Sequence, residues 1–337
     1  MSQSGPRADY RLLAPPGKVE PLERPPSFAI VITAYQAAET AAAAVRSALA
    51  QEHPADEVIV VDDGSTDDLR GALAPFEGQI ELVSKSNGGG ASARNAGVAA
   101  AASEFMAVLD ADDVYDPRRL GALAQLAVAR PDLDLITTDA RYVVDGEAVG
   151  TFATDNPFAV EDQREAIFRS CFVGGWPAVR VSRLEEIGGF DEEMRIAYDW
   201  DCWLRLILSG SSAGMVDEPY YDYVLHGGSL AASRVPSLWE RARLLEKVRL
   251  NPALRESERP LLEEAIRWRR SEAVREEASM IASGDARRSR SAALARLPNI
   301  DRRARAAALL ATTVPPLARR LSGDRRTPTA RITGAES

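Results

Sequence analysis

The chain has 337 residues, of which 45% are hydrophobic and 27% charged, and its formal net charge is −9. This length is enough for a full core, and the composition is that of a globular protein, so disordered and fibrous classes are excluded. The negative charge argues against nucleic-acid binding. Cys171 and Cys202 lack the spacing of a zinc site or a disulfide framework, and we find no signal peptide or membrane span, so we expect a cytoplasmic protein.

Composition divides the chain into four segments. Residues 1–26 hold six prolines without apolar periodicity, so we expect a mostly disordered leader. Residues 27–234 form the main predicted domain, and residues 235–284 a helical extension. Residues 285–337 form a basic Ala/Arg-rich tail with twelve arginines against four acidic residues. This tail either docks on an anionic membrane surface or is a solvated appendage.

Strand and helix patterns alternate through the first half of the main domain. Apolar runs typical of buried strands cover residues 28–33, 58–61, 80–84 and 105–109. Helical patterns occupy the stretches that end near residue 50, then 67–76, 91–102 and 120–129. This alternation predicts an α/β fold whose mainly parallel central sheet is flanked by helices. Further on, strand patterns at 133–138, 140–144 and 172–181 precede a core-facing helix at 198–209.

Polar side chains follow each of the first four predicted strands. They are Thr33 to Tyr35, Asp62 and Asp63, residues 84–87, and residues 110–113. Ligands of parallel α/β sheets bind beyond the carboxyl ends of the strands. The pattern therefore indicates a nucleotide site at this edge.

Two aspartates, Asp110 and Asp112, end the fourth predicted strand. Side chains two residues apart point the same way along a strand, so both carboxylates can face one ligand. Converging carboxylates repel unless a cation neutralises them, and oxygen ligands suit Mg²⁺ or Mn²⁺. The spacing predicts a divalent metal that carries a diphosphate. The alternative is a solvated turn or a helix cap.

Five motifs then occur in the order and spacing of a known family. They are VVDDGSTD (60–67), NGGGASARNAG (87–97), LDADD (109–113), GGFDE (188–192) and DWDCWLRL (199–206). Over residues 27–234 the chain resembles the family 2 inverting glycosyltransferases with the GT-A fold. The resemblance implies metal-dependent transfer of a sugar, with inversion, from a nucleotide-diphosphate sugar donor. The hydroxyl acceptor would be a glycan, a lipid-linked glycan or a small molecule, as in polysaccharide biosynthesis.

The resemblance also implies individual roles. The residues that would contact the nucleotide base or ribose are Thr33, Ala34, Tyr35, Glu39, Asp62 and Asp63. Those that would flank the nucleotide and sugar are Lys85, Asn87, Gly90, Arg94 and Ala111. The residues that would hold the metal are Asp110, Asp112 and His226, and the catalytic base would be Asp199. The sequence departs from the family twice, with Thr33-Ala34-Tyr35-Gln36 at the first turn and Tyr198 before Asp199.

Several assignments have structural alternatives. Asp199 is either the base or only a helix N-cap, and His226 is a ligand or a loop residue. Trp176 packs on a sugar or in the core, whereas Trp200 and Trp203 fit a core stripe, with Trp200 also a candidate for the acceptor site.

Three other functions are alternatives to sugar transfer. The strongest is a non-catalytic nucleotide-sugar-binding protein that acts through its helical C-terminus. A dehydrogenase would carry its glycine fingerprint at the first strand, where none exists, and a nucleotidyltransferase would carry a Gly- and Lys-rich loop there.

Overall fold

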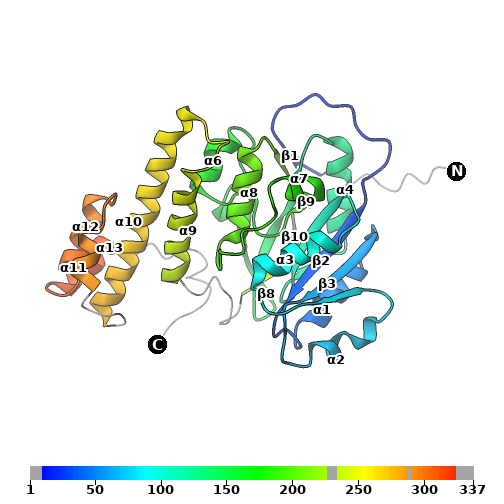
Figure 1. Ribbon diagram of the computed structural model, residues 1–337, viewed down its shortest axis with the longest axis horizontal. Coiled ribbons are helices and arrows are strands. Elements are labelled where there is room, and N and C mark those ends of the chain that lie inside the picture. Colours follow the sequence, from blue (N-terminus) through cyan, green and yellow to red (C-terminus); the bar gives the residue numbers. More distant parts are fainter. Residues whose placement is uncertain (1–9, 226–233, 285, 287–289, 324–337) are drawn as a thin grey trace. The chain divides into compact units, whose positions relative to one another are not determined.

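The computed structural model describes residues 10–225, 234–284, 286 and 290–323. The chain divides into two compact units, Met1–Leu225 and His226–Ser337, which we call the first and the second unit. Figure 1 shows that the first unit holds the strands and the second is helical.

Ten strands among the described residues form one sheet in the first unit, in the order β1-β10-β7-β9-β5-β2-β3-β4. Two more pairings lie off this path, β6 with β10 and β8 with β7. The strands are β1 (Leu12–Leu13), β2 (Phe28–Ala34), β3 (Glu57–Asp62), β4 (Glu81–Ser84), β5 (Phe105–Asp110), β6 (Val114–Tyr115), β7 (Leu135–Val144), β8 (Glu147–Thr151), β9 (Ala178–Arg180) and β10 (Ala213–Val224).

Most of these strands run in one direction. β2 pairs in parallel with β3 and β5, β3 with β4, and β7 with β10. β9 lies antiparallel between β5 and β7, so both of those strands still point the same way. The prediction of an α/β fold with a mainly parallel sheet is confirmed.

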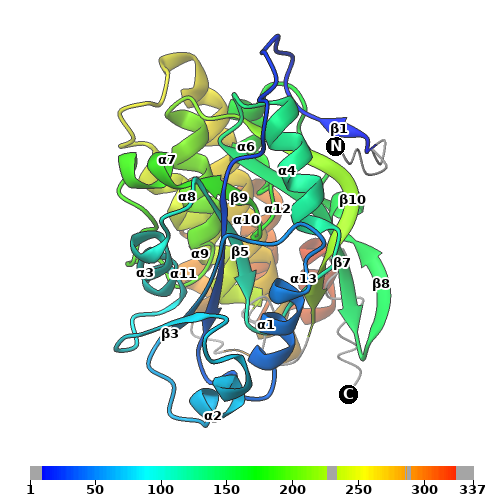
Figure 2. The same ribbon diagram turned by 90° about the vertical axis from the view of Figure 1, so that its right-hand side faces the viewer.

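Helices cover both faces of the sheet. They are α1 (Ala41–Leu49), α2 (Leu69–Leu73), the 3₁₀ helix η1 (Ala74–Phe76), α3 (Gly90–Ala100), α4 (Arg119–Ala129), α5 (Phe152–Asp155), α6 (Gln163–Arg169), α7 (Val181–Glu186) and α8 (Tyr198–Leu208). Alternate strand residues such as Phe28, Ile30 and Ile32 pack with α1, α2 and α4 in one core. α3, α7 and α8 lie across the sheet from α1 and α4 (Figure 2).

Two strands differ from the expected pattern. The run at 172–181 forms a strand only over Ala178–Arg180, because Gly174 has a left-handed φ of 82° and Pro177 follows. The 12-residue β10 was not predicted. Its register with β7 shifts on both sides of Pro219, which breaks the strand pattern in the sequence.

The expected disorder of the leader does not hold for residues 10–26. Leu12 and Leu13 pair with Val216 and Met215 of β10. Leu22 N–H donates to the Val128 carbonyl at 2.9 Å. These backbone contacts explain why a segment without apolar periodicity is ordered.

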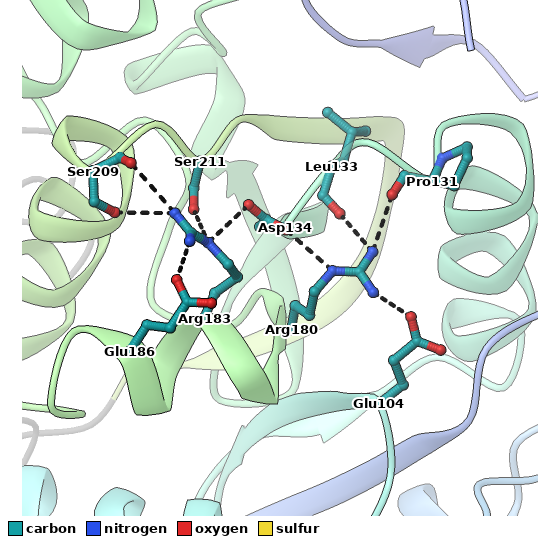
Figure 3. Close-up of polar contacts among 9 residues, drawn as sticks. All are labelled: Glu104, Pro131, Leu133, Asp134, Arg180, Arg183, Glu186, Ser209 and Ser211. Carbon is teal, nitrogen blue, oxygen red and sulfur yellow. Dashed lines mark hydrogen bonds and ion pairs between the residues drawn. The ribbon is translucent and has the colours of Figure 1, made fainter.

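At the amino ends of the parallel strands, on the side of the sheet opposite to the predicted site, two arginines link several elements by ion pairs and hydrogen bonds (Figure 3). Arg180 pairs with Asp134, which precedes β7, at 3.1 Å, and with Glu104, which precedes β5. Arg183 shares Asp134 at 3.3 Å and also contacts Glu186. This network fixes β9 and α7 at the amino ends of the parallel strands, away from the predicted site.

The described part of the second unit contains α9 (Arg234–Val248), η3 (Glu256–Glu258), α10 (Arg259–Ser283), α11 (Ser291–Ala295), α12 (Arg302–Leu310) and α13 (Pro315–Ser322). We expected a boundary between a helical extension and a tail at residue 284. Instead, alanines of α12 and α13 pack with Val274, Ala278 and Ile281 of α10 in one buried cluster. No described helix is both long enough and apolar enough to cross a membrane.

Candidate active site

The ends of four parallel strands bring the predicted polar residues to one edge. The register sets Thr33 beside Asp110, Ala34 beside Asp62, and Asp62 beside Ser84. The Thr33 hydroxyl donates to Asp110 Oδ1 at 3.1 Å. The strand order therefore places residues far apart in sequence in one row.

Arg94 projects from α3 to the first aspartate of the paired motif. Its Nη2 donates to both carboxylate oxygens of Asp110, at 3.1 and 3.2 Å. The guanidinium lies over the rings of Tyr198, at 5.0 Å, and Phe190, at 5.7 Å. Burial opposes its charge, but Tyr198, Asp110 and Asp199 together raise the pKa of Arg94 above its ordinary value. Arg94 therefore stays cationic inside the protein.

Asp113 lies beneath the paired motif and is buried. Its Oδ2 accepts a hydrogen bond from the Tyr221 hydroxyl at 2.6 Å, and its Oδ1 accepts one from Val224 N–H at 2.8 Å. Burial raises the pKa of Asp113, and the carboxylates of Asp112 and Asp110 raise it further. Three carboxyl groups therefore lie close together at this strand end, and burial and mutual repulsion disfavour the ionised form of Asp113.

The paired motif fits a hard divalent cation only in part. Asp112 is half-buried beside Asp110, and their oxygens are the donors that Mg²⁺ and Mn²⁺ prefer. The neighbouring carboxyl groups of Asp110, Asp112 and Asp113 repel one another when ionised, and a cation would relieve this repulsion. Among the described residues, no group of three or more His, Cys, Asp or Glu side chains could hold a metal. A cation here would need further oxygens, such as those of a diphosphate.

Asp62 and Asp63 face different surroundings. Asp62 is half-buried, and its Oδ1 caps the turn by accepting from Ser65 N–H at 2.8 Å. We expected Asp63 to join in nucleotide binding, but its buried carboxylate accepts from Lys85 Nζ at 2.7 Å and from the amides of Gly88 and Gly89. These donors surround Asp63, so it holds the 85–89 loop in place.

The same loop contains two other predicted residues. The Asn87 amide donates to the Asp63 carbonyl at 3.0 Å. Gly90 is the first residue of α3 and lies against Tyr198. A Cβ on Gly90 would collide with the Tyr198 hydroxyl. Asn87 and Gly90 therefore have structural reasons for their identity in addition to any contact with a ligand.

The loop after β2 presents one exposed aromatic ring. Tyr35 is 55% exposed, Glu39 is also exposed, and Ala34 is buried, so Ala34 offers only its backbone. Gln36 has a left-handed φ of 52°, and its side-chain amide forms hydrogen bonds with Thr66 and with the backbone N–H of Asp67. Gln36 thus ties this loop to the loop after β3, while the ring of the preceding residue, Tyr35, stays exposed.

Asp199 lies in the first turn of α8, but it is not the N-cap. Ala197, with a left-handed φ of 60°, occupies that position. Asp199 Oδ1 accepts from the next residue's N–H at 2.7 Å, and a Cβ on Gly175 would lie 3.1 Å from Asp199 Oδ2. The absence of a side chain at Gly175 leaves space beside this carboxylate.

The neighbouring residues of α8 are structural. Asp201 is buried and pairs with Arg205 at 2.8 Å, and Arg205 also donates to the carbonyls of Ile187 and Gly189. Trp200 and Trp203 are buried, which confirms the core stripe. Trp176 is also buried and stacks on Tyr221 at 4.8 Å, so it packs in the core.

Sequence reasoning missed three residues that shape the site. The Asn95 side chain of α3 holds the backbone of Phe190 by two hydrogen bonds, at 2.7 and 2.9 Å. Tyr221 links the Asp110 amide to Asp113. Arg119 is fully buried, with its guanidinium over the rings of Tyr115 and Tyr221. Tyr221 lies in the unpredicted β10. His226 lies outside the described residues.

An open, mainly parallel α/β sheet with polar side chains at the carboxyl ends of its strands is an arrangement in which nucleotides commonly bind. Residues 29–188 match the family model for glycosyl transferase family 2. Residues 29–188 of the first unit are therefore similar to the glycosyltransferase domains of this family.

Individual relatives agree with this family. The succinoglycan biosynthesis protein ExoU of Rhizobium meliloti is 31% identical over 227 residues, which are 62% of this chain and 65% of ExoU. ExoO of the same organism is 30% identical over 224 residues, which are 62% of this chain and 64% of ExoO. The chain thus spans just under two thirds of these relatives.

A solved structure resembles the fold. S. aureus TarS 1–349 in complex with UDP-GlcNAc gives a TM-score of 0.60 at 18% identity, over 87% of this chain and 89% of that chain. This likeness establishes a GT-A-like fold for the chain, together with a helical C-terminal region.

Proposed function

We propose that this chain transfers a sugar, with inversion, from a nucleotide-diphosphate sugar to a hydroxyl acceptor. The observation that carries the proposal is the position of Arg94, which pairs with Asp110 at 3.1 Å and lies within electrostatic reach of Asp199. The carboxylates of the strand ends and the carboxylate of α8 thus share one cationic neighbour. Such an arrangement suits a donor bound at the strand ends and an acceptor activated at the helix.

The donor would bind along the ends of β2, β3 and β5. The exposed ring of Tyr35 would stack on the base, and Asp62 would bond the base or ribose, with Glu39 nearby. The backbone of Ala34 and Ala111 would line the floor, and Lys85, Asn87, Gly90 and Arg94 would flank the diphosphate and sugar. TarS was solved with UDP and with UDP-GlcNAc, which supports a donor of this class.

A divalent cation, Mg²⁺ or Mn²⁺, would be held by Asp112 and Asp110, with His226 as a further candidate ligand. When bound, it would offset the negative charge of the leaving nucleoside diphosphate. Asp113 would not be a ligand, because Tyr221 and Val224 already donate to both of its oxygens. Its task would be to fix the backbone beneath Asp112.

Asp199 would act as the general base. A carboxylate within hydrogen-bond reach of the acceptor hydroxyl can take its proton as the hydroxyl attacks the anomeric carbon. The N-terminus of α8 favours the ionised form of this carboxylate. Tyr198 cannot replace it as a base, because burial raises the pKa of Tyr198 to about 12.

The proposals for the acceptor and the cellular location rest on the relatives and on the composition of the chain. The names of ExoU and ExoO assign those proteins to succinoglycan biosynthesis, which supports a role of this chain in polysaccharide biosynthesis. Cys171 and Cys202 are free thiols, as expected in the cytoplasm. We also propose peripheral contact of the basic C-terminal segment with an anionic membrane surface. The alternative function remains a binding protein without catalysis, which would bind the donor and never transfer.

Thermal unfolding with candidate donors tests the proposal. UDP-, GDP- and dTDP-sugars are compared with Mn²⁺ and with chelator, followed by transfer assays to hydroxyl acceptors. One nucleotide class should raise the melting temperature, because a ligand that binds only the folded state stabilises it. Failure of all three classes to bind would overturn the proposal, whereas binding without any transfer or donor hydrolysis would support the binding protein.

A further inference from the structure

Helices α12 and α13 form an antiparallel hairpin that buries its small residues. Alanines face the cluster shared with α10, and they are Ala304, Ala307, Ala308, Ala311 and Ala318. The Arg303 guanidinium donates to the carbonyls of Leu321, at 2.6 Å, and Arg320. The start of α12 therefore lies beside the end of α13, and the connection between the helices forms the other end of the hairpin.

Large apolar side chains are exposed at the connecting end. Leu309 is 57% exposed, and Val314 and Leu317 are each 43% exposed. Leu309 lies in the last turn of α12, while Val314 and Leu317 lie before and within the first turn of α13. Alanines are thus buried while three larger apolar side chains, which lie within nine residues of the chain, stay in contact with solvent at this end of the hairpin. We call these three residues the apolar tip.

Arginines lie within the first four residues of α12 and in the second half of α13, on the side of the hairpin away from the connection. The exposed ones are Arg302, Arg303, Arg305, Arg319 and Arg320. The one acidic residue in the described stretch 290–323 is Asp301, which caps α12 and pairs with Arg275 at 2.8 Å. We call these five arginines the basic base. Its positive charge is thus not balanced within the hairpin.

We propose that this hairpin docks on an anionic lipid bilayer, with its apolar tip in the acyl boundary and its basic base at the lipid phosphates. α12 has 9 residues and is therefore about 13 Å long. Interfacial helices bury their apolar face roughly 5–10 Å deep, and basic residues near the surface bind anionic lipids. The segregation of charge along the hairpin matches this gradient from headgroup to hydrocarbon.

Docking would bring the chain to acceptors that are carried by a lipid. The choice of a lipid-linked acceptor rests on the proposed function, whereas docking itself requires no catalysis. Vesicle binding can therefore fail while sugar transfer is intact, and the reverse can also occur.

Co-sedimentation of the full chain with vesicles tests the docking. Phosphatidylglycerol mixed with phosphatidylcholine is compared with phosphatidylcholine alone, at low and physiological salt. The tip variant is Leu309→Ser/Leu317→Ser and the base variant is Arg302→Gln/Arg319→Gln/Arg320→Gln. Leu250→Ser is the control, because Leu250 is 87% exposed and lies outside the hairpin.

The parent chain and Leu250→Ser should bind the anionic vesicles equally. The tip and base variants should each bind at least about tenfold more weakly. A Leu317→Trp variant should shift its emission to the blue on binding, which reports on the tip without weakening it. No binding by the parent chain, or binding by the tip and base variants that equals that of the parent, would overturn the proposal. Self-association that only the tip variant abolishes would make this face an interface between copies instead.

Discussion

Arg94 and Asp110 form an ion pair that joins the interior of α3 to the end of β5. The Arg94 side chain is 3% exposed and the Asp110 side chain 35% exposed, so the cation lies inside and the carboxylate faces the site. Arg94 Nε and Nη1 have no hydrogen-bond partner among the described residues. The pair therefore fixes Asp110 and retains donor capacity beside the strand ends.

Replacing Arg94 by lysine tests this pair. Arg94→Lys keeps the positive charge but loses the rigid guanidinium, whose Nη2 donates to both oxygens of Asp110. We expect donor affinity to fall about tenfold, the cost of losing one or two hydrogen bonds to a charged group. Titration calorimetry with the donor identified by thermal shift measures this, with exposed Arg46→Lys as control. Equal affinity in the two variants would contradict the role of Arg94.

Asp112 should set the metal dependence of the reaction. Asp112→Asn removes one carboxylate charge from the strand end, so the concentration of Mn²⁺ needed for half-maximal donor turnover should rise by roughly tenfold or more. Asp145→Asn, in the exposed β7–β8 turn, should leave that concentration unchanged. The measurement is turnover across a Mn²⁺ titration. Full activity of Asp112→Asn in excess chelator would exclude the metal role.

The fold could be predicted where burial is uniform. Phe28, Ile30 and Ile32 belong to a strand buried on both faces, which leaves a continuous apolar run in the sequence. β10 could not be found this way, because Asp217 to Pro219 interrupt its pattern and shift its register. Tyr221, which lies in β10, was missed for the same reason.

The directions of the side chains at the site could be predicted as far as the ends of the strands, but not in the loops that follow. Strand alternation determines the direction of side chains only while the strand continues. Beyond the ends of β3 and β5, loop geometry turns Asp63 and Asp113 inward to protein donors, while Asp62 and Asp112 remain half-buried. Adjacent aspartates look alike in the sequence, so their tasks cannot be separated without the structure.

Tyr221 should stabilise the paired motif from below. Tyr221→Phe removes the hydroxyl that accepts from the Asp110 amide and donates to Asp113, and so leaves a buried carboxylate without one donor. The free energy of unfolding should fall by about 1–3 kcal/mol. Urea denaturation measures this change, with Tyr35→Phe at the surface as the control. Equal stability of the two variants would show that Asp113 does not depend on this hydrogen bond.

Acid should weaken the fold partly through Asp116. The Arg118 guanidinium, by hydrogen bonding, holds the pKa of Asp116 below its ordinary value. A pKa that is lower in the folded than in the unfolded chain adds stability above the unfolded value of about 3.9, and this stability is lost as pH falls through the folded value. The parent should therefore be more stable than Asp116→Asn at neutral pH, and the difference should narrow below pH ~4. Urea unfolding across this pH range measures the difference in the free energy of unfolding. A difference that does not depend on pH would contradict stabilisation by the Arg118–Asp116 ion pair.

Asp199→Asn tests the central claim most directly. Asparagine keeps the shape of the side chain in the first turn of α8 but cannot take the proton from the hydroxyl of the sugar acceptor. Sugar transfer at saturating donor and acceptor should therefore fall by roughly 10²–10⁴-fold, while donor affinity by calorimetry stays within about twofold of the parent. Exposed Glu193→Gln, just ahead of the same helix, should transfer at the parent rate. Near-parent transfer by Asp199→Asn would contradict the assignment of Asp199 as the base.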